Sequence, residues 1–290
     1  TILPRPQLLA TIQDKYSQKR FLSEAGIPTS EFVDIPTPSR ERFERFGYPL
    51  VQKARRGGYD GRGVAIMYGP DEFDQHLPVP SYVERFVDAE KEIAVIVARS
   101  LARECRAYPA VEMRFHPDGN VLDFLVAPAN VSADIAARAE ALAIDTVNAL
   151  EGVGVFGIEM FLDRKGELLV NEVAPRTHNS GHHTIEACVT DQFEQHLRAI
   201  LGLPLGATRQ LAPATMVNLL GEPGYAGRPV IVGLRAALQI PGVCLHIYGK
   251  AVTKPGRKMG HVTIVDDTTE VACSKAAEVK KLIKILGEVR

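Results

Sequence analysis

The chain has 290 residues, of which 46% are hydrophobic and 24% charged, so it is long enough to bury a substantial core. Its 34 basic and 35 acidic residues leave a net charge of −1, which argues against a nucleic-acid or membrane-surface binder that relies on a basic excess. The four cysteines form no CxxC pair, and no apolar run resembles a membrane span or signal peptide, so we expect a cytoplasmic protein without a zinc or disulfide framework.

The first half of the chain is predicted to combine short strands with two helices. A short linker is expected at residues 3–6. Apolar residues among charged ones then predict a helix over residues 14–25, ended by Gly26 with Pro28 just beyond it. Ala, Ile and Leu at helical spacing predict a second, core-facing helix over residues 132–150. Apolar or β-branched runs predict strands at residues 51–53, 64–67, 81–86 and 92–97.

The second half is predicted to open with an antiparallel hairpin. Its strands are residues 155–162 and 167–173, joined by a turn at 163–166. A helix is expected over residues 184–201, followed by a small terminal β unit. That unit is predicted to contain strands at 214–219, 234–238 and 261–265 and a closing helix at 274–288. The pattern as a whole indicates an α+β protein with several lobes.

A glycine-rich loop lies between two predicted strands. Four glycines within residues 57–63 let backbone N–H groups approach phosphate oxygens, and Lys53 ends the preceding strand, where it could pair with the same phosphates. The spacing matches neither a Walker loop nor a dinucleotide fingerprint. A hairpin loop that needs only flexibility is the alternative. The concentration of Lys53 with Arg55, Arg56 and Arg62 favours phosphate binding.

Two glutamates lie in the predicted hairpin, Glu159 on its first strand and Glu172 on its second, with Asn171 beside Glu172. Antiparallel register can bring such side chains onto one face. Two carboxylates and an amide oxygen there would suit Mg²⁺ bound together with nucleotide phosphates. The alternative, that each glutamate points outward to solvent, agrees equally well with the alternation of side chains along a strand.

Residues 176–183, directly after the hairpin, carry three histidines, an arginine and an asparagine. They lack the i, i+4 histidine pair of a zinc hydrolase, so we predict a polar substrate loop rather than a metal site. A basic cluster near the C-terminal end could hold a second phosphate, that of a substrate, although a solvated basic turn is the alternative. This cluster consists of Lys250, Lys254, Arg257, Lys258 and His261 around Pro255-Gly256.

Taken in chain order, these segments resemble the 5-(carboxyamino)imidazole ribonucleotide synthases, a branch of the ATP-grasp enzymes in purine biosynthesis. The most specific strings are Gly-Gly-Tyr-Asp-Gly-Arg-Gly at residues 57–63 and His-Asn-Ser-Gly-His at residues 178–182. These two strings separate the branch from other ATP-grasp relatives. The remaining matches are residues 14–22, 26–29, 53, 83–87, 92, 127–129, 171–176, 192–199 and 256–261.

The resemblance implies the ATP-grasp fold, in which two α+β lobes clasp ATP, with a small C-terminal β domain. We expect residues 1–30 to form a linker and first helix, and 31–87 the small lobe with the glycine-rich loop. Residues 88–210 would form the large lobe with the Mg²⁺ and substrate sites, and 211–290 the C-terminal β domain with its closing helix. Family members usually begin with an α/β domain that carries a Gly-x-Gly-Gln-Leu-Gly opening. No segment here matches it, so we expect this chain to lack that domain.

The implied reaction uses ATP and Mg²⁺. ATP phosphorylates bicarbonate, and the resulting carboxyphosphate, or CO₂ released from it, carboxylates the amine of 5-aminoimidazole ribonucleotide. The products are ADP, phosphate and the N-carboxylated ribonucleotide, and the implied assembly is a homodimer when the N-terminal domain of the family is present. One alternative is another ATP-grasp ligase, such as a formate-dependent glycinamide ribonucleotide transformylase. The other is a nucleotide-binding fragment without turnover.

The resemblance also implies roles for individual residues. Lys15 and Lys53 would hold the phosphates and Glu92 the ribose hydroxyls, while the backbone of residues 84–87 would read the adenine. The implied ATP-binding set is Lys15, Lys53, Gly58, Tyr59, Asp60, Gly61, Arg62, Gly63, Val64, Glu84, Arg85, Phe86, Val87, Glu92, Asn171 and Glu172. The implied Mg²⁺ ligands are Glu159 and Glu172. The implied carboxylation residues are Tyr59, Asp60, Arg62, His178 and Asn179, and the implied ribonucleotide-binding residues are Arg176, His178, Lys250, Arg257 and Lys258.

Overall fold

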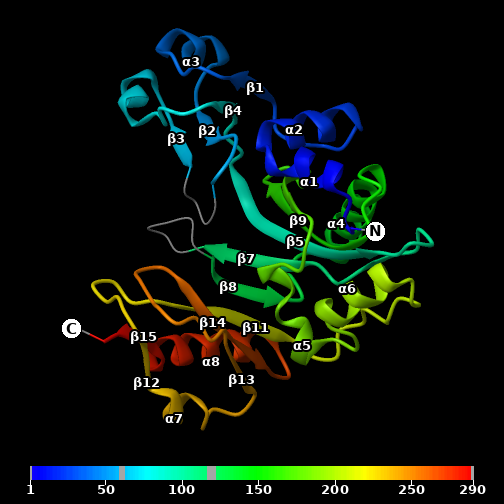
Figure 1. Cartoon of the computed structure of the whole chain (residues 1–290), viewed down its shortest axis with the longest axis vertical. Coiled ribbons are helices and arrows are strands. Elements are labelled where there is room, and N and C mark those ends of the chain that lie inside the picture. Colours follow the sequence, from blue (N-terminus) through cyan, green and yellow to red (C-terminus); the bar gives the residue numbers. More distant parts are fainter. Residues whose placement is uncertain (1, 59–62, 116–121, 289–290) are drawn as a thin grey trace.

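The computed structural model of this chain describes residues 2–58, 63–115 and 122–288. Within these residues the strands form a four-stranded sheet, a nine-stranded sheet and a two-stranded ribbon, with helices packed against them (Figure 1). This arrangement confirms the predicted α+β class. No helix in the described part is both long enough and apolar enough to cross a membrane.

The four-stranded sheet forms the small lobe, at the top of Figure 1. Its strands are antiparallel and lie in the order β1 (Phe32–Ile35), β4 (Ser81–Arg85), β2 (Leu50–Ala54) and β3 (Val64–Met67). Helix α3 (Arg40–Phe46) and the 3₁₀ turn η1 (Pro70–Gln75) lie beside this sheet. The buried core of the lobe consists of Ile35, Phe43, Leu50, Met67 and Val83.

The nine-stranded sheet is the largest of the three, and every strand pair in it is antiparallel. The strands from the C-terminal part of the chain extend this same sheet, because β11 pairs directly with β8. The order is β10 (Leu168–Ala174), β9 (Gly154–Asp163), β5 (Ala89–Arg99), β7 (Val111–Phe115), β8 (Leu122–Ala127), β11 (Ala214–Leu220), β14 (Lys258–Val265) and β13 (Val243–Ile247), with β6 (Cys105–Ala107) beside β5.

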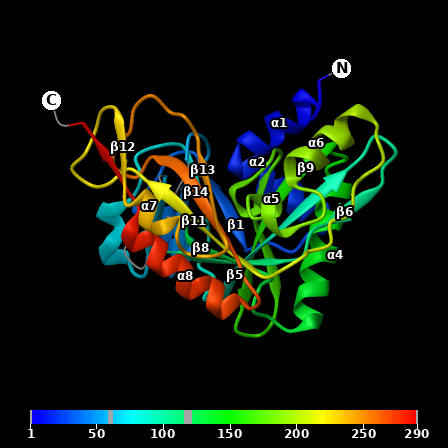
Figure 2. The ribbon, with the colours of Figure 1, turned by 90° about the horizontal axis from the view of Figure 1, so that it is seen from below.

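Helices cover both faces of the large sheet. Alternate residues of β5 point to opposite faces: Val95 packs in a cluster with α4 (Ala133–Ala149), and Ile96 packs with Ala199 of α6 (Gln192–Leu201). Figure 2 shows α8 (Thr269–Leu282) lying across the C-terminal strands, where it contacts β11 and β14.

The N-terminal segment contains two helices, α1 (Pro6–Gln13) and α2 (Lys15–Glu24). The sequence predicted α2, and Asp14 begins it by accepting a hydrogen bond of 3.0 Å from the backbone N–H of Ser17. Helix α1 was not predicted, and it begins at the last residue of the predicted linker. Its first residue is Pro6, and a proline fits the first turn of a helix because that turn needs no N–H donor there.

The prediction of one helix over residues 184–201 is wrong. Helix α5 (Thr184–Ala187) ends at Cys188, whose backbone is extended. Helix α6 then begins anew, because the Asp191 carboxylate accepts a hydrogen bond of 2.7 Å from the backbone N–H of Phe193. The break separates residues that an uninterrupted helix would have placed on one face.

The prediction of a strand over residues 234–238 is also wrong, because Leu234–Ala237 form the short helix α7. Gly233, directly before it, has a φ of +77°, and a Cβ atom there would lie 1.8 Å from the carbonyl oxygen of Leu282. Only glycine fits this close turn, and the turn redirects the chain so that a strand cannot continue.

The predicted closing helix over residues 274–288 exists but is misplaced. Helix α8 starts earlier, where the Thr268 hydroxyl accepts a hydrogen bond from the backbone N–H of Val271. It ends at Leu282. The chain then forms β15 (Lys284–Gly287), which pairs with β12 (Pro229–Val232) in the two-stranded ribbon.

Candidate functional site

The hairpin of β9 and β10 places two carboxylates side by side. Glu159 and Glu172 are direct cross-strand partners, and the register shifts by one residue between Val170 and Glu172. Without this bulge Glu172 would lie opposite Ile158 and face the other side of the sheet. The bulge therefore puts both carboxylates on one face and leaves Asn171 as the extra, unpaired residue.

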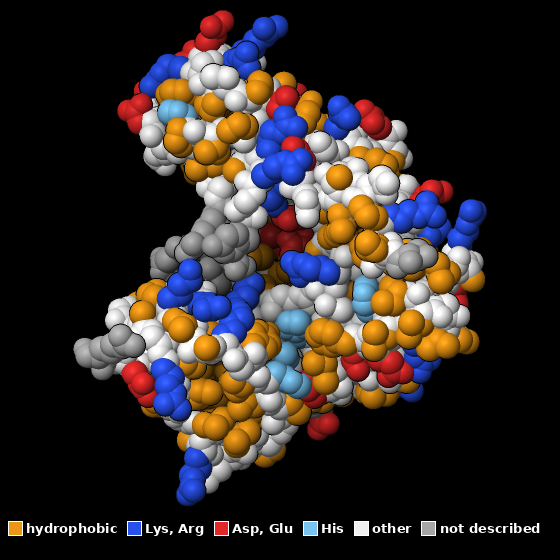
Figure 3. Space-filling view, in the orientation of Figure 1, with side chains coloured by type: hydrophobic (Ala, Val, Ile, Leu, Met, Phe, Trp, Pro, Cys, Tyr) orange, Lys and Arg blue, Asp and Glu red, His pale blue; other side chains and the backbone are white. Residues whose placement is uncertain are grey.

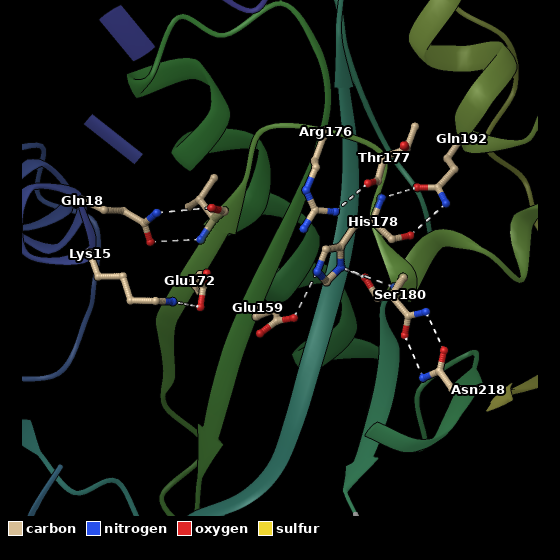
Figure 4. A network of polar contacts seen from close by, with 12 residues as sticks. Lys15, Gln18, Glu159, Glu172, Arg176, Thr177, His178, Ser180, Gln192 and Asn218 are labelled. Atoms are coloured by element: carbon tan, nitrogen blue, oxygen red, sulfur yellow. Dashed lines mark hydrogen bonds and ion pairs between the residues drawn. The ribbon is translucent and has the colours of Figure 1, made fainter. Parts of the chain in front are cut away.

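Two lysines from the N-terminal part of the chain contact this region of the hairpin. Lys15, the first residue of α2, forms an ion pair with the Glu172 carboxylate (Figure 4). Lys53, near the end of β2, donates a hydrogen bond of 2.7 Å from its Nζ to Asn171 Oδ1. The small lobe and the large sheet thus meet through charged and polar side chains. Figure 3 shows the corresponding hollow between them, with acidic side chains at its depth and basic ones along its edge.

The electrostatics of the hollow favour an added cation. Burial raises the pKa of Glu159 to about 7, and the nearby carboxylates of Glu172 and Glu92 shift it in the same direction. Burial likewise raises the pKa of Glu92 to about 7, although the ammonium group of Lys53 opposes this. Carboxylates that share a small space resist ionisation, and a bound cation removes that resistance.

The chemistry of the donors fits Mg²⁺. The two carboxylates and the Asn171 amide oxygen are hard oxygen ligands of the kind that this ion prefers. Within residues 2–58, 63–115 and 122–288, no three His, Cys, Asp or Glu side chains are grouped so that they could hold a metal ion. A cation bound by this pair would therefore need further oxygens, such as those of phosphates.

Glu84 on β4 belongs to a buried ion-pair network. Only 2% of its side chain is exposed; it pairs with Lys53 and, at 2.7 Å, with Lys19, and it accepts a hydrogen bond of 2.8 Å from Ser30. Burial alone would raise the pKa of Glu84, but the two ammonium groups outweigh it and lower the pKa to about 2. The Glu84 side chain is thus committed to lysines, and a role in reading adenine would fall to the backbone of this segment.

Of the other residues predicted near the adenine, Arg85 ends β4, and Phe86 and Val87 lie between β4 and β5. The Arg85 side chain contacts the end of α3, donating to the carbonyl oxygens of Phe46 at 3.0 Å and Gly47 at 3.1 Å. The backbone N–H of Phe86 donates to Pro49, and the carbonyl of Val87 accepts from Ala89.

The glycine-rich loop is described only at its two ends. Gly58 and Gly63 approach each other closely: a Cβ atom on Gly63, whose φ is +78°, would lie 3.3 Å from the Cα atom of Gly58. The backbone N–H of Ala54 donates to the Gly63 carbonyl at 2.8 Å, and Val64 opens β3. The predicted site residues Tyr59, Asp60, Gly61 and Arg62 lie outside the described residues.

His178 packs against Gly157 of β9 and lies beside Glu159 of the carboxylate pair. Its Nε2 lies 3.4 Å from Glu159 Oε1, and its Nδ1 lies 2.8 Å from the Ser180 hydroxyl (Figure 4). A Cβ atom on Gly157 would lie 2.7 Å from the His178 Cβ, so the imidazole packs where only a glycine leaves room. The histidine loop and the carboxylate pair therefore form one continuous site.

Three buried amide side chains that the sequence did not single out support this site. Gln18 exchanges hydrogen bonds with the backbone of Val173, beside Glu172. Gln192 does the same with His178, and Asn218 pairs with the side chain of Asn179. The available signal was an amide inside an apolar segment, as in Ala214–Leu220, because a buried amide requires a partner.

The basic cluster lies on the C-terminal strands and the turn before β14. Lys258 is near enough to influence both Glu159 and His182: together with burial, it lowers the pKa of His182 to about 4, and it opposes the rise at Glu159. Lys250 Nζ donates to the Lys258 carbonyl at 2.5 Å, and Arg257 Nη1 donates to the Val252 carbonyl at 2.7 Å.

Arg176 lies at the start of the histidine loop. It donates to the carbonyl of Thr177 at 3.0 Å, and its charge also contributes to the lowered pKa of His182. The structure thus brings Arg176 and Lys258 toward the same histidine, although they are far apart in sequence.

Comparisons with known proteins agree with this geometry. A model of the ATP-grasp domain matches residues 20–193, and a model of the phosphoribosylaminoimidazole carboxylase C-terminal domain matches residues 214–275. The chain is 46% identical over 281 residues to a phosphoribosylaminoimidazole carboxylase of Schizosaccharomyces pombe. That match covers 92% of this chain and 50% of the yeast protein, so the chain spans about half the length of this relative.

Solved structures match over nearly the whole chain. An N5-carboxyaminoimidazole ribonucleotide synthetase from Thermotoga maritima superposes with a TM-score of 0.90 at 49% identity, over 99% of this chain and 76% of that one. An N5-carboxyaminoimidazole synthase from Aspergillus clavatus, in complex with ADP and 5-aminoimidazole ribonucleotide, gives a TM-score of 0.88 at 34% identity, over 97% and 75%. The chain belongs to the ATP-grasp family, in its branch of N5-carboxyaminoimidazole ribonucleotide synthases.

Proposed function

We propose that this chain carboxylates 5-aminoimidazole ribonucleotide with ATP and bicarbonate, releasing ADP and phosphate, in purine biosynthesis. The observation that carries the proposal is the position of Glu159, opposite Glu172 on one side and 3.4 Å from His178 on the other. One carboxylate thus joins a phosphate-binding region to the histidine loop. The Aspergillus clavatus relative, solved with ADP and 5-aminoimidazole ribonucleotide, supports these two ligands for the same hollow.

On the nucleotide side, the two lysines would bind the phosphates. Lys15 and Lys53 now pair with Glu172 and Asn171, and they would exchange these oxygens for phosphate oxygens when ATP enters. Glu159 and Glu172, with Asn171, would then hold Mg²⁺, which when bound neutralises charge on the phosphates. Residues 58–64, with Tyr59, Asp60 and Arg62, would cover the phosphates, while the backbone of residues 84–87 would read the adenine and Glu92 the ribose.

The reaction requires two transfers. A bicarbonate oxygen attacks the γ-phosphorus of ATP, and ADP leaves; the amine nitrogen of the ribonucleotide then attacks the carboxyl carbon, phosphate leaves, and the amine loses a proton. His178 and Asn179 would orient the carboxyl group between these steps, and the proximity of His178 to Glu159 supports this role. Such transfers depend on positioning and charge neutralisation more than on covalent help from the protein.

The ribonucleotide would enter from the side of the C-terminal strands. Its phosphate is assigned to Lys250 and Arg257, with Arg176 and Lys258 bringing further positive charge near His182, because several cations together compensate a dianion. The influence of Lys258 on both Glu159 and His182 supports this assignment. The proposal also includes a homodimer in the cytoplasm, and sedimentation equilibrium of the purified chain would measure its oligomeric state.

The test is ADP release with Mg²⁺, ATP and bicarbonate, measured with and without 5-aminoimidazole ribonucleotide. We expect the ribonucleotide to stimulate ADP release and to be carboxylated in equal amount. Glycinamide ribonucleotide with formate is the matched comparison for another ATP-grasp ligase. Stimulation by that pair instead, or ATP binding without any ADP release, would contradict the proposal.

A further inference from the structure

Two asparagine side chains from distant parts of the chain form a reciprocal pair beside the histidine loop. Asn179 Nδ2 donates to Asn218 Oδ1 at 2.9 Å, and Asn218 Nδ2 donates back to Asn179 Oδ1 at 3.2 Å. Asn179 opens the 3₁₀ turn η2 (Asn179–Gly181), whereas Asn218 lies on β11 and is only 8% exposed. A strand of the C-terminal part therefore holds a side chain of the predicted carboxylation site.

The backbone of His178, the residue before Asn179, is already fixed by another amide. Gln192, fully buried at the start of α6, accepts from the His178 N–H at 2.8 Å and donates to the His178 carbonyl at 2.8 Å (Figure 4). A Cβ atom on Gly181 would lie 2.4 Å from Gln192 Oε1, so the turn fits tightly against this glutamine. With the backbone held in this way, the direction of the Asn179 carboxamide is the main freedom that remains.

Asn218 removes that remaining freedom. A carboxamide can be turned by 180° with little change in shape, so its orientation depends on its hydrogen-bond partners. Asn218 Nδ2 lies 3.5 Å from the carbonyl oxygen of Leu122 on β8, which can only accept. This contact favours the orientation in which Asn218 Nδ2 faces the Leu122 carbonyl, and the reciprocal pair then favours the matching orientation of Asn179.

We propose that Asn218 is a positioning residue that orients the Asn179 carboxamide for the transfer of the carboxyl group to the ribonucleotide. The pair uses one N–H and one oxygen lone pair of each amide, so one N–H and one lone pair of Asn179 remain for a ligand. This inference rests on the proposed function. It adds that the strand β11, outside the matched ATP-grasp segment, determines the geometry of the second transfer step.

The first test compares Asn218→Ala with the unaltered chain, measuring ADP and carboxylated ribonucleotide in the same reaction. We expect the carboxylation rate to fall about ten- to a hundredfold, the range for a lost buried hydrogen-bond partner. Mg-ATP affinity should stay within about twofold, and less product should form per ADP. An unaltered ratio of product to ADP, in a chain whose wild type carboxylates, overturns the inference and leaves the proposed function standing.

A double-mutant cycle separates positioning from a general effect on the strand. If Asn218 acts through Asn179, then Asn218→Ala should cause no further loss of carboxylation in an Asn179→Ala background. Additive losses would overturn the inference. Thr215→Val is the matched control: Thr215 is also buried on β11, but its hydroxyl contacts the Cys273 sulfur at 3.3 Å. This variant should keep the product-to-ADP ratio of the wild type, and a fall equal to that of Asn218→Ala would contradict the proposal.

Discussion

The side chains on the two sides of the hollow are held in place by different kinds of interaction. On the side of the glycine-rich loop the contacts are ionic, with Lys15 on Glu172 and Lys53 on Glu84. On the side of the histidine loop, the buried contacts that hold the loop are hydrogen bonds of neutral amides, with Gln192 on the His178 backbone and Asn218 on Asn179. A charged ligand would compete for the partners of the ion pairs, whereas the amide hydrogen bonds involve no charged group.

This difference distinguishes side chains that would bind a ligand from side chains that hold other residues in position. Lysine ammonium groups that pair with carboxylates can exchange those partners for phosphates at little cost, because each charge remains compensated. A buried amide that loses its partner leaves an unsatisfied polar group and gains nothing in return. We therefore expect variants on the ionic side to alter ligand binding and catalysis, and variants on the neutral side to alter geometry.

The largest effect is expected for Glu172→Gln. The substitution keeps the size of the side chain but removes one charge from the carboxylate pair, so the proposed Mg²⁺ ligand is lost. We expect ADP release to fall about a thousandfold, the upper range for loss of one electrostatic group in a phosphoryl or acyl transfer site. Because Glu172 is 44% exposed, the melting temperature should barely change.

Glu167→Gln is the control for this variant. Glu167 lies beside the turn of the same hairpin, and its contact with Arg138, at 3.6 Å, is exposed. It should retain full ADP release. Release near the wild-type level in Glu172→Gln itself would remove Glu172 from the proposed metal site.

A second prediction concerns the stability of the ionic side. Glu84→Gln leaves the buried ammonium group of Lys19 without its counter-charge, so we expect the free energy of unfolding to fall by about 3 kcal/mol. The folded pKa of Glu84 is about 2, below its ordinary value of 4.5, so its contribution is complete above pH 4.5 and disappears as the pH falls toward 2. Urea unfolding at several pH values measures both effects.

The comparison for Glu84 is Glu31→Gln. Glu31 forms an exposed ion pair with Arg85 at 3.3 Å, which should contribute less than about 1 kcal/mol. The difference in stability between the wild type and Glu84→Gln should shrink below pH 4.5. A difference that stays constant down to pH 2 would show that the charge of Glu84 does not stabilise the fold.

Much of the fold could be predicted from sequence because it depends on local patterns. The hairpin of β9 and β10 follows from two apolar runs around a short polar turn, and α4 follows from helical spacing after Ser132. The failures occurred where one residue overrides the pattern. Asp191 restarts a helix, and Gly233 turns a short apolar run into α7 rather than a strand.

The candidate site was likewise predictable only where it depends on local sequence. Glu159 and Glu172 could be paired from the hairpin, but the bulge that aligns them depends on the register of the folded sheet. Asn218 could not be linked to Asn179, because their contact spans 39 residues and requires β11 to pair with β8. Long-range pairing of strands is fixed by the whole sheet, so a single strand does not reveal it.

A third prediction tests the neutral side. Gly157→Ala would place a methyl group 2.7 Å from the His178 Cβ, so His178 must shift away from Glu159. We expect carboxylation to fall about thirtyfold, because a misplacement of about 1 Å can cost up to a hundredfold. ADP release should fall less, which would uncouple the two transfers. Gly166→Ala, in the turn of the same hairpin, is a control for strain at a glycine. Equal losses of ADP and product in Gly157→Ala would contradict a role limited to the histidine loop.

The smallest effect is expected at the rim, for Arg257→Ala. Its guanidinium now donates to the Val252 carbonyl, and in the proposal it also contacts the phosphate of the ribonucleotide. Loss of one charge-assisted contact at a partly exposed position should raise the KM for the ribonucleotide about tenfold, while kcat and the KM for ATP stay nearly constant. Arg235→Ala, which removes a cation from α7 in the same part of the chain, should change neither constant. An equal rise in both KM values would place Arg257 on the ionic side, which is proposed to bind the nucleotide. Arg257 would then belong with Lys15 and Lys53 and not with the residues around the histidine loop.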